Sequence, residues 1–251
     1  MIVGSTKENL SAEKRVSITP ETAKNIINLG LKVILENNYA NHIGIADKEY
    51  ETVGVEIKKS SQEVFNSCNL LTKVNCPSED EISNIKNKTI LVGMLNPTKN
   101  QNKLKEMIKK NINLFSLELL PRISRAQSMD VLSSQSNLAG YRSVVDSIYE
   151  FEKAIPMMMT AAGTVPAAKV LVIGAGVAGL QAIATAKRIG AIVSATDVRA
   201  ASKEQVESLG GKFLTVEQSE NLETAGGYAK EASEEFKQKQ AEMMKDALKK
   251  N

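Results

Sequence analysis

The chain has 251 residues, of which 42% are hydrophobic and 24% charged, and its formal net charge is +3. This length accommodates one large domain or two of ordinary size, and the composition is typical of globular proteins. Acidic residues nearly balance the basic ones and aromatic residues make up only 4%, which argues against a nucleic-acid-binding surface. The N-terminus has no apolar secretory core, and no uncharged run reaches the ~18–20 apolar residues of a membrane-spanning helix, so we expect no direct membrane insertion.

The first 121 residues alternate short apolar runs with polar segments of helical character. Thr19 and Pro20 predict the start of a helix, as N-cap and first helical residue, and Gly30 predicts its end. Further helices are expected over residues 78–85 and 99–110. Apolar runs of buried-strand length cover residues 31–36, 70–74, 89–95 and 112–118. This alternation predicts an N-terminal α/β lobe with a parallel sheet over residues 1–121.

A connecting region and a second lobe are expected after this. Residues 122–168 combine a polar stretch, helical periodicity over 133–154 and an uncharged entry loop over 156–166 that contains three consecutive methionines. A second α/β lobe is predicted over residues 169–251. Its tail, residues 228–251, has the pattern of an amphipathic surface helix.

Neither a metal site nor a disulfide is expected. Cys68 and Cys76 have no Cys or His at ligand spacing around them, so we interpret both as ordinary reduced thiols. The single histidine, His42, lies in a loop-like Asn-His-Ile-Gly stretch, where histidines are usually structural or solvated.

The most informative stretch is a glycine turn between a strand and a helix. A strand is expected over residues 169–173, a helix over 177–189 and a second strand over 191–196. The turn between the first two carries the G-x-G-x-x-G pattern of dinucleotide-binding proteins. In this pattern the first glycine permits a tight turn, the second lets the backbone approach a pyrophosphate, and the third allows the helix to pack on the strand. The residues of the turn are Gly174, Ala175, Gly176, Val177, Ala178 and Gly179.

An acidic residue completes this fingerprint. Asp197 follows Gly179 by 18 residues, at the end of the second strand, where such an acid accepts hydrogen bonds from the adenosine ribose. Its charge would repel a 2′-phosphate, so NAD is favoured over NADP, with Val198 beside it in the site. Arg199 is the one feature that could weaken this preference; otherwise it is an exposed edge residue over the adenine.

Four segments carry a further signal. They read AGTVPAAKVLVIGAGVAGLQAIATAKRIGAIVSATDVRAASKEQVESLGGKF, PRISRAQSMDVLSSQSNLAGYR, ETAGGYAKE and KENLSAEKRVSITPE. The first three resemble the NAD(H)-binding domain at the N-terminus of proton-translocating transhydrogenase α subunits. The fourth is similar to the start of that domain and of its relative, alanine dehydrogenase. The resemblance extends from about Lys7 to the last residue and is far more specific than the glycine turn alone.

This resemblance implies a fold and an activity. The fold is α/β, with two Rossmann-like lobes built on parallel sheets and NAD(H) in the cleft between them, usually in a homodimer. Because the family's domain continues well past this point, the second lobe is expected to be incomplete. The activity is direct hydride transfer from NADH to NADP on a partner subunit that binds NADP(H), coupled to proton translocation by a membrane-spanning partner. The implied location is peripheral, on the cytoplasmic side of the inner membrane.

The resemblance also assigns site residues. Arg122, Gln127, Asp130 and Ser133 match the loop that holds the nicotinamide end, and the first three of these form the expected catalytic set. In that family the glutamine reaches toward the partner's NADP. Tyr228 matches the tip of a mobile loop that closes over bound nucleotide, and the preceding Gly226-Gly227 pair could act as its hinge.

Two other functions remain open. In an amino-acid dehydrogenase of the alanine dehydrogenase type, Arg15 and Lys73 match the positions that bind the substrate carboxylate and keto group. Amine oxidation needs a group that moves a proton near neutral pH, however, and residues 94–97 read Met-Leu-Asn-Pro where those enzymes carry a histidine. Hydride transfer between two nicotinamides needs no acid or base, so the missing histidine favours transhydrogenation. The third possibility is an NAD-binding module without turnover of its own.

Overall fold

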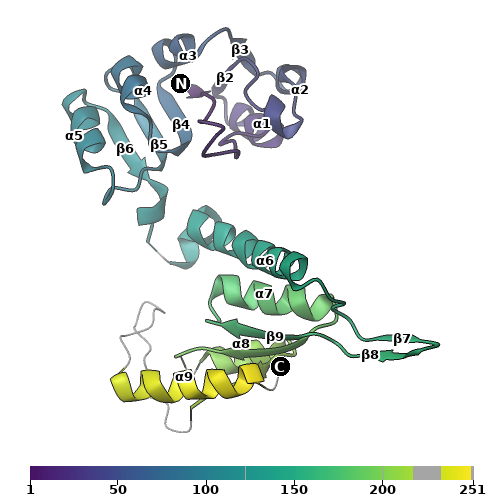
Figure 1. Ribbon diagram of the computed structural model, residues 1–251. Helices are drawn as coiled ribbons and strands as arrows, with labels where there is room; N and C mark the ends of the chain where they lie inside the picture. The colour runs from purple at the N-terminus through teal and green to yellow at the C-terminus, as the bar shows by residue number, and fades with distance from the viewer. Residues whose placement is uncertain (122, 200, 217–232, 250–251) are drawn as a thin grey trace. The chain divides into compact units, whose positions relative to one another are not determined.

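The computed structural model describes residues 1–121, 123–199, 201–216 and 233–249. The chain divides into two compact units, Met1–Asp130 and Val131–Asn251 (Figure 1). The division falls within residues 122–168, for which the sequence predicts a connection between lobes.

Unit 1 contains a six-stranded parallel sheet in the order β3-β2-β1-β4-β5-β6. This is the order of a doubly wound fold, in which successive crossovers change side between β1 and β4. Val3 of β1 lies opposite Val33 of β2 on one side and Leu70 of β4 on the other. The strands are β1 (Ile2–Ser5), β2 (Lys32–Glu36), β3 (Glu56–Lys58), β4 (Leu70–Asn75), β5 (Ile90–Met94) and β6 (Asn113–Ser116).

Helices cover this sheet and bury two apolar clusters against it. Thr19 caps α1 as predicted, because its side chain accepts a hydrogen bond from the Thr22 N–H, and Gly30 follows with a left-handed φ of +80°. One cluster packs under α1 and α2 and includes Tyr50, and the other packs under α3, α4 and α5 and includes Phe65. The helices are α1 (Pro20–Asn28), α2 (Asp47–Thr52), α3 (Ser61–Ser67), α4 (Glu79–Asn84) and α5 (Gln101–Lys109), with 3-10 turns η1 (Asn41–Ile43), η2 (Leu117–Leu119) and η3 (Ser124–Met129).

Unit 2 contains a smaller parallel sheet in the order β11-β10-β9. Parallel pairing of β9 with β10 requires a crossover, which α7 supplies, and α8 supplies the next one. The elements are α6 (Val131–Phe151), β7 (Met158–Thr160), β8 (Gly163–Val165), β9 (Lys169–Ile173), α7 (Val177–Arg188), β10 (Ile192–Thr196), α8 (Ser202–Ser208), β11 (Lys212–Phe213) and α9 (Glu234–Lys249).

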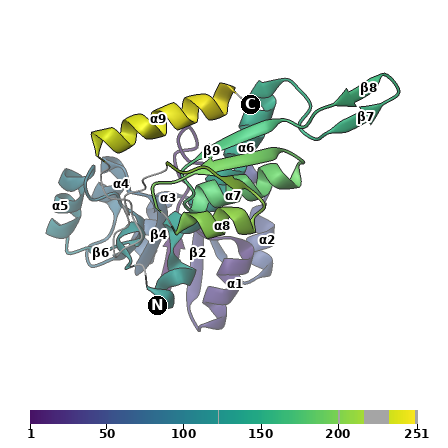
Figure 2. The same ribbon diagram turned by 90° about the horizontal axis from the view of Figure 1, so that it is seen from below.

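Helix α6 belongs to unit 2 and packs directly on α7, as both ribbon views show (Figures 1 and 2). The contact is close because Gly140 has no side chain: a Cβ there would lie 2.0 Å from the Ala178 carbonyl oxygen. Asn137 also donates from Nδ2 to Gln181 Oε1 at 3.1 Å across the same interface. The long helix α6 therefore supports α7, the helix that begins at the glycine turn.

The uncharged segment 156–166 is not the plain loop that its sequence predicts. It forms an antiparallel hairpin of β7 and β8 that extends away from the rest of unit 2 (Figure 2). The Thr160 hydroxyl donates to the Gly163 carbonyl and accepts from the Ala162 N–H, which stabilises the tight turn. All six strand residues are exposed, and Met159 has 81% of its surface exposed.

The last described element is the helix α9, where the sequence predicts one. Glu235 pairs with Lys239 at 2.7 Å across one helical turn, as the i,i+4 spacing predicts. Within the described ranges, no helix is both long and apolar enough to cross a membrane.

Candidate functional site

The glycine turn joins β9 to α7 in the geometry that the fingerprint predicts. Gly174 has a φ of +91°, a left-handed conformation that favours glycine, and its N–H donates to the Thr196 carbonyl at 2.8 Å. A Cβ on Gly179 would lie only 1.8 Å from the Gly174 carbonyl oxygen. The third glycine is thus required because the first turn of the helix packs against the strand end.

The N-terminus of α7 faces out of this turn. Gly176 is the N-cap residue, and no side chain within the described residues caps the helix there. The first N–H groups of a helix have no partners inside it, and together with the helix dipole they favour an anion. Val177 and Ala178, for which the sequence predicts contacts with a pyrophosphate, belong to this first helical turn.

Asp197 lies at the end of β10, directly beside the turn. Its Oδ2 accepts from the Ala175 N–H at 2.7 Å, which ties the second strand to the glycine turn. Its Oδ1 accepts from the Arg199 N–H at 2.8 Å, and its side chain is only 6% exposed. Burial opposes ionisation, but the hydrogen bonds from Arg199 and Ala175 outweigh it and lower the pKa of Asp197. The carboxylate is therefore charged at neutral pH.

Arg199 is not the exposed edge residue that its position in the sequence allowed. Its side chain is 21% exposed, and it donates to both oxygens of Asp197, from Nε at 2.9 Å and from Nη2 at 3.0 Å. Val198 is half-buried between the two. Side chains two residues apart after a strand end can point to the same side, but the sequence alone does not predict that Asp197 and Arg199 form an ion pair.

The predicted nicotinamide-end residues fall in different regions of the chain. Gln127 is exposed on the turn η3, and its carbonyl accepts from the Asp130 N–H at 3.2 Å, so these two lie together at the end of unit 1. Ser133 is half-buried in the first turn of α6, in unit 2. Arg122 and Tyr228 lie outside the described residues.

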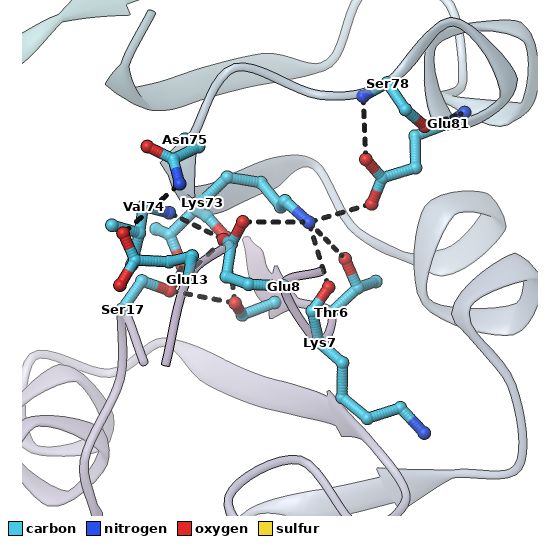
Figure 3. Close-up of polar contacts among 12 residues, drawn as sticks. Thr6, Lys7, Glu8, Glu13, Ser17, Lys73, Val74, Asn75, Ser78 and Glu81 are labelled. Carbon is cyan, nitrogen blue, oxygen red and sulfur yellow. Dashed lines mark hydrogen bonds and ion pairs between the residues drawn. The ribbon is translucent and has the colours of Figure 1, made fainter. Parts of the chain in front are cut away.

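A second polar cluster surrounds Lys73 in unit 1, and the sequence points to Lys73 but to none of its carboxylate partners (Figure 3). The Lys73 ammonium lies 2.8 Å from Glu81 Oε1 and 3.5 Å from Glu8 Oε2, and its side chain is 2% exposed. It also donates to the Lys7 carbonyl at 3.0 Å and the Thr6 hydroxyl at 3.4 Å. These residues come from the carboxyl ends of β1 and β4 and from α4, where an open α/β sheet usually binds ligands.

Neighbouring carboxylates extend this cluster. Glu8 accepts from the Val74 N–H at 2.8 Å, and burial raises its pKa although Lys73 opposes the shift. Glu13 receives Arg15 Nη2 at 2.7 Å and Nε at 2.9 Å, and Asn75 Nδ2 at 3.2 Å. Hydrogen bonds from Arg15 are the main reason that the pKa of Glu13 falls to about 2. Both cations that could bind a substrate carboxylate or keto group are thus paired with carboxylates of the chain itself.

Thiols and the histidine show no arrangement for metal or nucleophilic chemistry. Cys68 and Cys76 are both free, and burial raises the pKa of the Cys68 thiol to about 11. His42 is exposed and its Nε2 lies 2.8 Å from the Lys14 carbonyl oxygen. Among the residues whose positions are described, no group of three or more His, Cys, Asp or Glu side chains could hold a metal ion.

Two family models together match nearly all of the chain. Residues 4–139 match "Alanine dehydrogenase/PNT, N-terminal domain" and residues 143–251 match "Alanine dehydrogenase/PNT, C-terminal domain". The chain is 52% identical over 251 residues to the first component of the divided NAD(P) transhydrogenase subunit alpha of Rhodospirillum rubrum, covering 97% of this chain and 65% of that relative. It is 28% identical over 228 residues to an alanine dehydrogenase of Methanococcus maripaludis, covering 90% of this chain and 61% of that one.

A solved structure agrees with these relatives. The transhydrogenase of Sinorhizobium meliloti superposes with a TM-score of 0.82 at 48% sequence identity, covering 86% of this chain and 64% of that one. The chain therefore spans about two thirds of the length of the relatives it matches.

Proposed function

Because the chain belongs to the alanine dehydrogenase/PNT family, we propose that it is the NAD(H)-binding component of a proton-translocating NAD(P) transhydrogenase. The observation that carries the proposal is the turn between β9 and α7, with an uncapped helix N-terminus on one side and the Asp197 carboxylate on the other. Together these offer backbone N–H groups to a pyrophosphate and a buried acid to a ribose.

The acid supports NAD(H) over NADP(H) at this turn. A carboxylate that is charged and 6% exposed accepts hydrogen bonds from ribose hydroxyls but repels a 2′-phosphate. Arg199 neutralises part of the charge of the Asp197 carboxylate. The preference for NAD(H) over NADP(H) therefore depends on how far a bound ribose displaces the arginine from Asp197. NADP(H) would then be held by a partner subunit.

Direct hydride transfer requires the two nicotinamides to be correctly positioned, and it needs no acid or base. NADH supplies a hydride that passes directly to the nicotinamide of NADP, and a reacting distance of roughly 3–3.5 Å accounts for much of the rate. Gln127 is suited to alignment because its exposed amide carries a donor and an acceptor and no charge. In the proposed site Arg122 and Asp130 bind the carboxamide or ribose, Ser133 supports the nicotinamide end, and Tyr228 closes over the nucleotide.

The alternative, an alanine dehydrogenase, has less support. Its substrate would need the Arg15 guanidinium and the Lys73 ammonium, and Glu13, Glu8 and Glu81 occupy both. The single histidine, His42, lies in η1 rather than after β5, and its Nε2 is 2.8 Å from the Lys14 carbonyl oxygen. Two cations engaged by internal carboxylates are a poor receptor for a further carboxylate.

The proposed assembly combines this chain with two kinds of partner. The NADP(H)-binding and membrane-spanning subunits are separate partners, and this chain is peripheral on the cytoplasmic side of the membrane. Two copies of the chain form a homodimer. The exposed hairpin supports the dimer, since an isolated two-stranded hairpin is marginally stable in water, and Met157 and Met159 expose 61% and 81% of their surfaces. Sedimentation of the chain at increasing concentration tests the dimer.

Single-turnover transfer from NADH to an NADP analogue tests the function, with the chain combined with its NADP(H)-binding partner. Gln127→Asn should lower the transfer rate by about 100-fold, since misplacement by ~1 Å has effects of that size. Its NADH affinity, measured separately by titration, should change by less than about threefold. Gln101→Asn, an exposed glutamine on α5, is the matched control and should transfer normally.

Two outcomes would contradict the proposal. No transfer by the unmodified chain with its partner would remove the transhydrogenase function and leave an NAD-binding module. A normal rate for Gln127→Asn would remove this glutamine from the site.

A further inference from the structure

Helices α6 and α7 run in the same direction, and each carries a part of the proposed site that unit 2 contributes. Gly140 of α6 lies against Ala178, the second residue of α7. After the two helices end, Pro156 lies against Gly190, where a Cβ would be 2.8 Å from the Pro156 Cβ. The start of α6 therefore lies on the same side of these contacts as the glycine turn, at which α7 begins.

Ser133 and Asn137 lie on the face of α6 that meets α7. Ser133 precedes Gly140 by seven residues, which is nearly two full turns, so the two positions share one face of the helix about 10 Å apart. Asn137 lies one turn after Ser133, and its Nδ2 donates to Gln181 Oε1 at 3.1 Å. This hydrogen bond joins α7 to the part of α6 that carries the proposed nicotinamide contact.

Apolar packing anchors the middle of α6 but not its start. The structure describes every residue of this helix, and only Gly140 and Val144 are buried. Val144 belongs to the apolar cluster of unit 2, together with Ala175 of the glycine turn, whereas Leu138 is exposed. The half of the helix that precedes Gly140 therefore depends on polar contacts, such as that of Asn137, for its position on α7.

The Gln181 amide is oriented to accept this hydrogen bond. Its Nε2 donates to Thr185 Oγ1 at 3.0 Å, and the Thr185 hydroxyl donates to the Gln181 carbonyl at 2.8 Å. Thr185 is buried, so these hydrogen bonds hold the amide in place on α7. Because its NH2 group is directed at Thr185, Gln181 presents its acceptor oxygen to Asn137.

We propose that Asn137 and Gln181 are positioning residues for hydride transfer. In the proposed site the pyrophosphate of NADH binds at the start of α7, and Ser133 on α6 supports the nicotinamide end. The hydrogen bond between the helices sets the distance between these two contacts. It acts on the nicotinamide through Ser133 rather than by contact with the nucleotide. This inference rests on the proposed function and adds two residues to it.

The test compares hydride transfer with binding of ADP-ribose, which has the pyrophosphate and both riboses but no nicotinamide. Asn137→Leu removes the hydrogen bond at an exposed position and introduces a better helix former, so the fold should be retained. In the chain combined with its NADP(H)-binding partner, single-turnover transfer from NADH should fall at least about fivefold, since misplacement by ~1 Å can cost ~100-fold. ADP-ribose affinity, measured by titration, should stay within about twofold.

Two further variants locate the effect. Gln181→Leu removes the same hydrogen bond from the side of α7 and should also slow transfer. The double variant should transfer no more slowly than the slower single variant, because the two changes remove one shared contact. Asn102→Leu, the same change at an exposed asparagine of α5, is the matched control and should transfer at the unmodified rate. Thermal melts check that all variants are folded at the temperature of the assay.

Three results would overturn the inference while leaving the proposed function intact. Asn137→Leu could transfer hydride at the rate of the unmodified chain. Its loss of transfer could be matched by an equal loss of ADP-ribose affinity, which would mean that the pair supports the glycine turn instead. The effects of the two single variants could add in the double variant, which would mean that the residues act separately. If the unmodified chain transfers no hydride, the proposed function fails and this inference fails with it.

Discussion

Arg199 binds both carboxylate oxygens of Asp197, from Nε at 2.9 Å and from Nη2 at 3.0 Å, while the Ala175 N–H holds the same carboxylate from the glycine turn. The acid that the fingerprint assigns to the ribose is therefore also the hydrogen-bond acceptor of Arg199. A ribose bound at this carboxylate would compete with Arg199 for the same oxygens, so we expect the arginine to influence cofactor choice.

Asp197→Ala should weaken NADH binding and narrow the preference over NADPH. The loss of a charge-assisted hydrogen bond costs about 1.5–3 kcal/mol, or roughly ten- to a hundredfold in affinity. Titration of both nucleotides measures the change. Asp146→Ala, which removes an exposed carboxylate paired with Arg142 on α6, is the control and should leave both affinities unchanged. Equal affinity for NADH and NADPH in the unmodified chain would contradict the assignment.

Arg199→Ala should widen the preference for NADH over NADPH. Without the guanidinium, the Asp197 carboxylate keeps its full charge and repels a 2′-phosphate more strongly, and a ribose no longer competes with the arginine. A double-mutant cycle with Asp197→Ala should give a coupling energy above ~0.5 kcal/mol. If Arg199→Ala instead weakens NADH binding, the arginine contacts the nucleotide directly, and the ribose does not displace it from Asp197.

Gly140→Ala should destabilise the protein although alanine is the better helix former. The new Cβ would lie 2.0 Å from the Ala178 carbonyl oxygen, so α6 would have to move away from α7. Overpacking of this kind costs about 1–3 kcal/mol, which outweighs the gain in helix propensity of about 1 kcal/mol. Thermal unfolding measures the effect. Leu138→Ala, at a residue 58% exposed on the same helix, should change stability by less than half as much.

Lys73→Met should destabilise the chain by about 3–5 kcal/mol, because it leaves the buried Glu8 carboxylate without its cation. The double variant Lys73→Met/Glu8→Gln should recover some of that loss, since the uncompensated charge is then absent. Denaturant unfolding of both variants gives the comparison. Lys58→Met, which breaks an exposed pair with Glu56, should cost less than ~1 kcal/mol. No recovery in the double variant would show that packing of the lysine stem dominates.

Acid should remove the stabilisation that Glu13 provides. Its pKa in the folded chain is about 2, below the ordinary value of 4.5, chiefly because of hydrogen bonds from Arg15. A carboxylate with a lowered pKa stabilises the fold above its unfolded pKa, and that contribution is lost as the pH falls from 4.5 toward 2. Glu13→Gln should therefore be less stable at pH 7, and its difference from the unmodified chain should shrink across this range. A difference independent of pH would contradict the pairing.

The elements that could be predicted from sequence are those with strong local signals. Apolar runs of strand length predicted β2, β4, β5 and β6, and the glycine pattern between a strand and a helix predicted the turn at Gly174. The short helix α2 was missed because it is polar and depends on tertiary contacts: Tyr50 is fully buried and its hydroxyl donates to the Ile18 carbonyl. Strand β3, with only three residues, has no periodicity to detect.

Contacts between distant residues account for the rest. No local pattern indicates that Gly140 meets Ala178, or that Lys73 is neutralised by Glu8, because each pair is joined only by the fold. The hairpin of β7 and β8 was missed for a different reason. Its strands are three residues long and fully exposed, so they lack the alternation of buried and exposed side chains that marks a strand.

The cluster around Lys73 also sets an order of events during synthesis. Lys7 and Lys73 are 66 residues apart in sequence, and at roughly 5–20 residues per second the ribosome needs roughly 3–13 seconds to add the second after the first. Until Lys73 has left the ribosome, the Glu8 carboxylate lacks the ammonium that it pairs with in the folded chain. The contacts of residues 6–8 with Lys73 thus form later than the pairing of β1 with β2 can, although those three residues are among the first to be made.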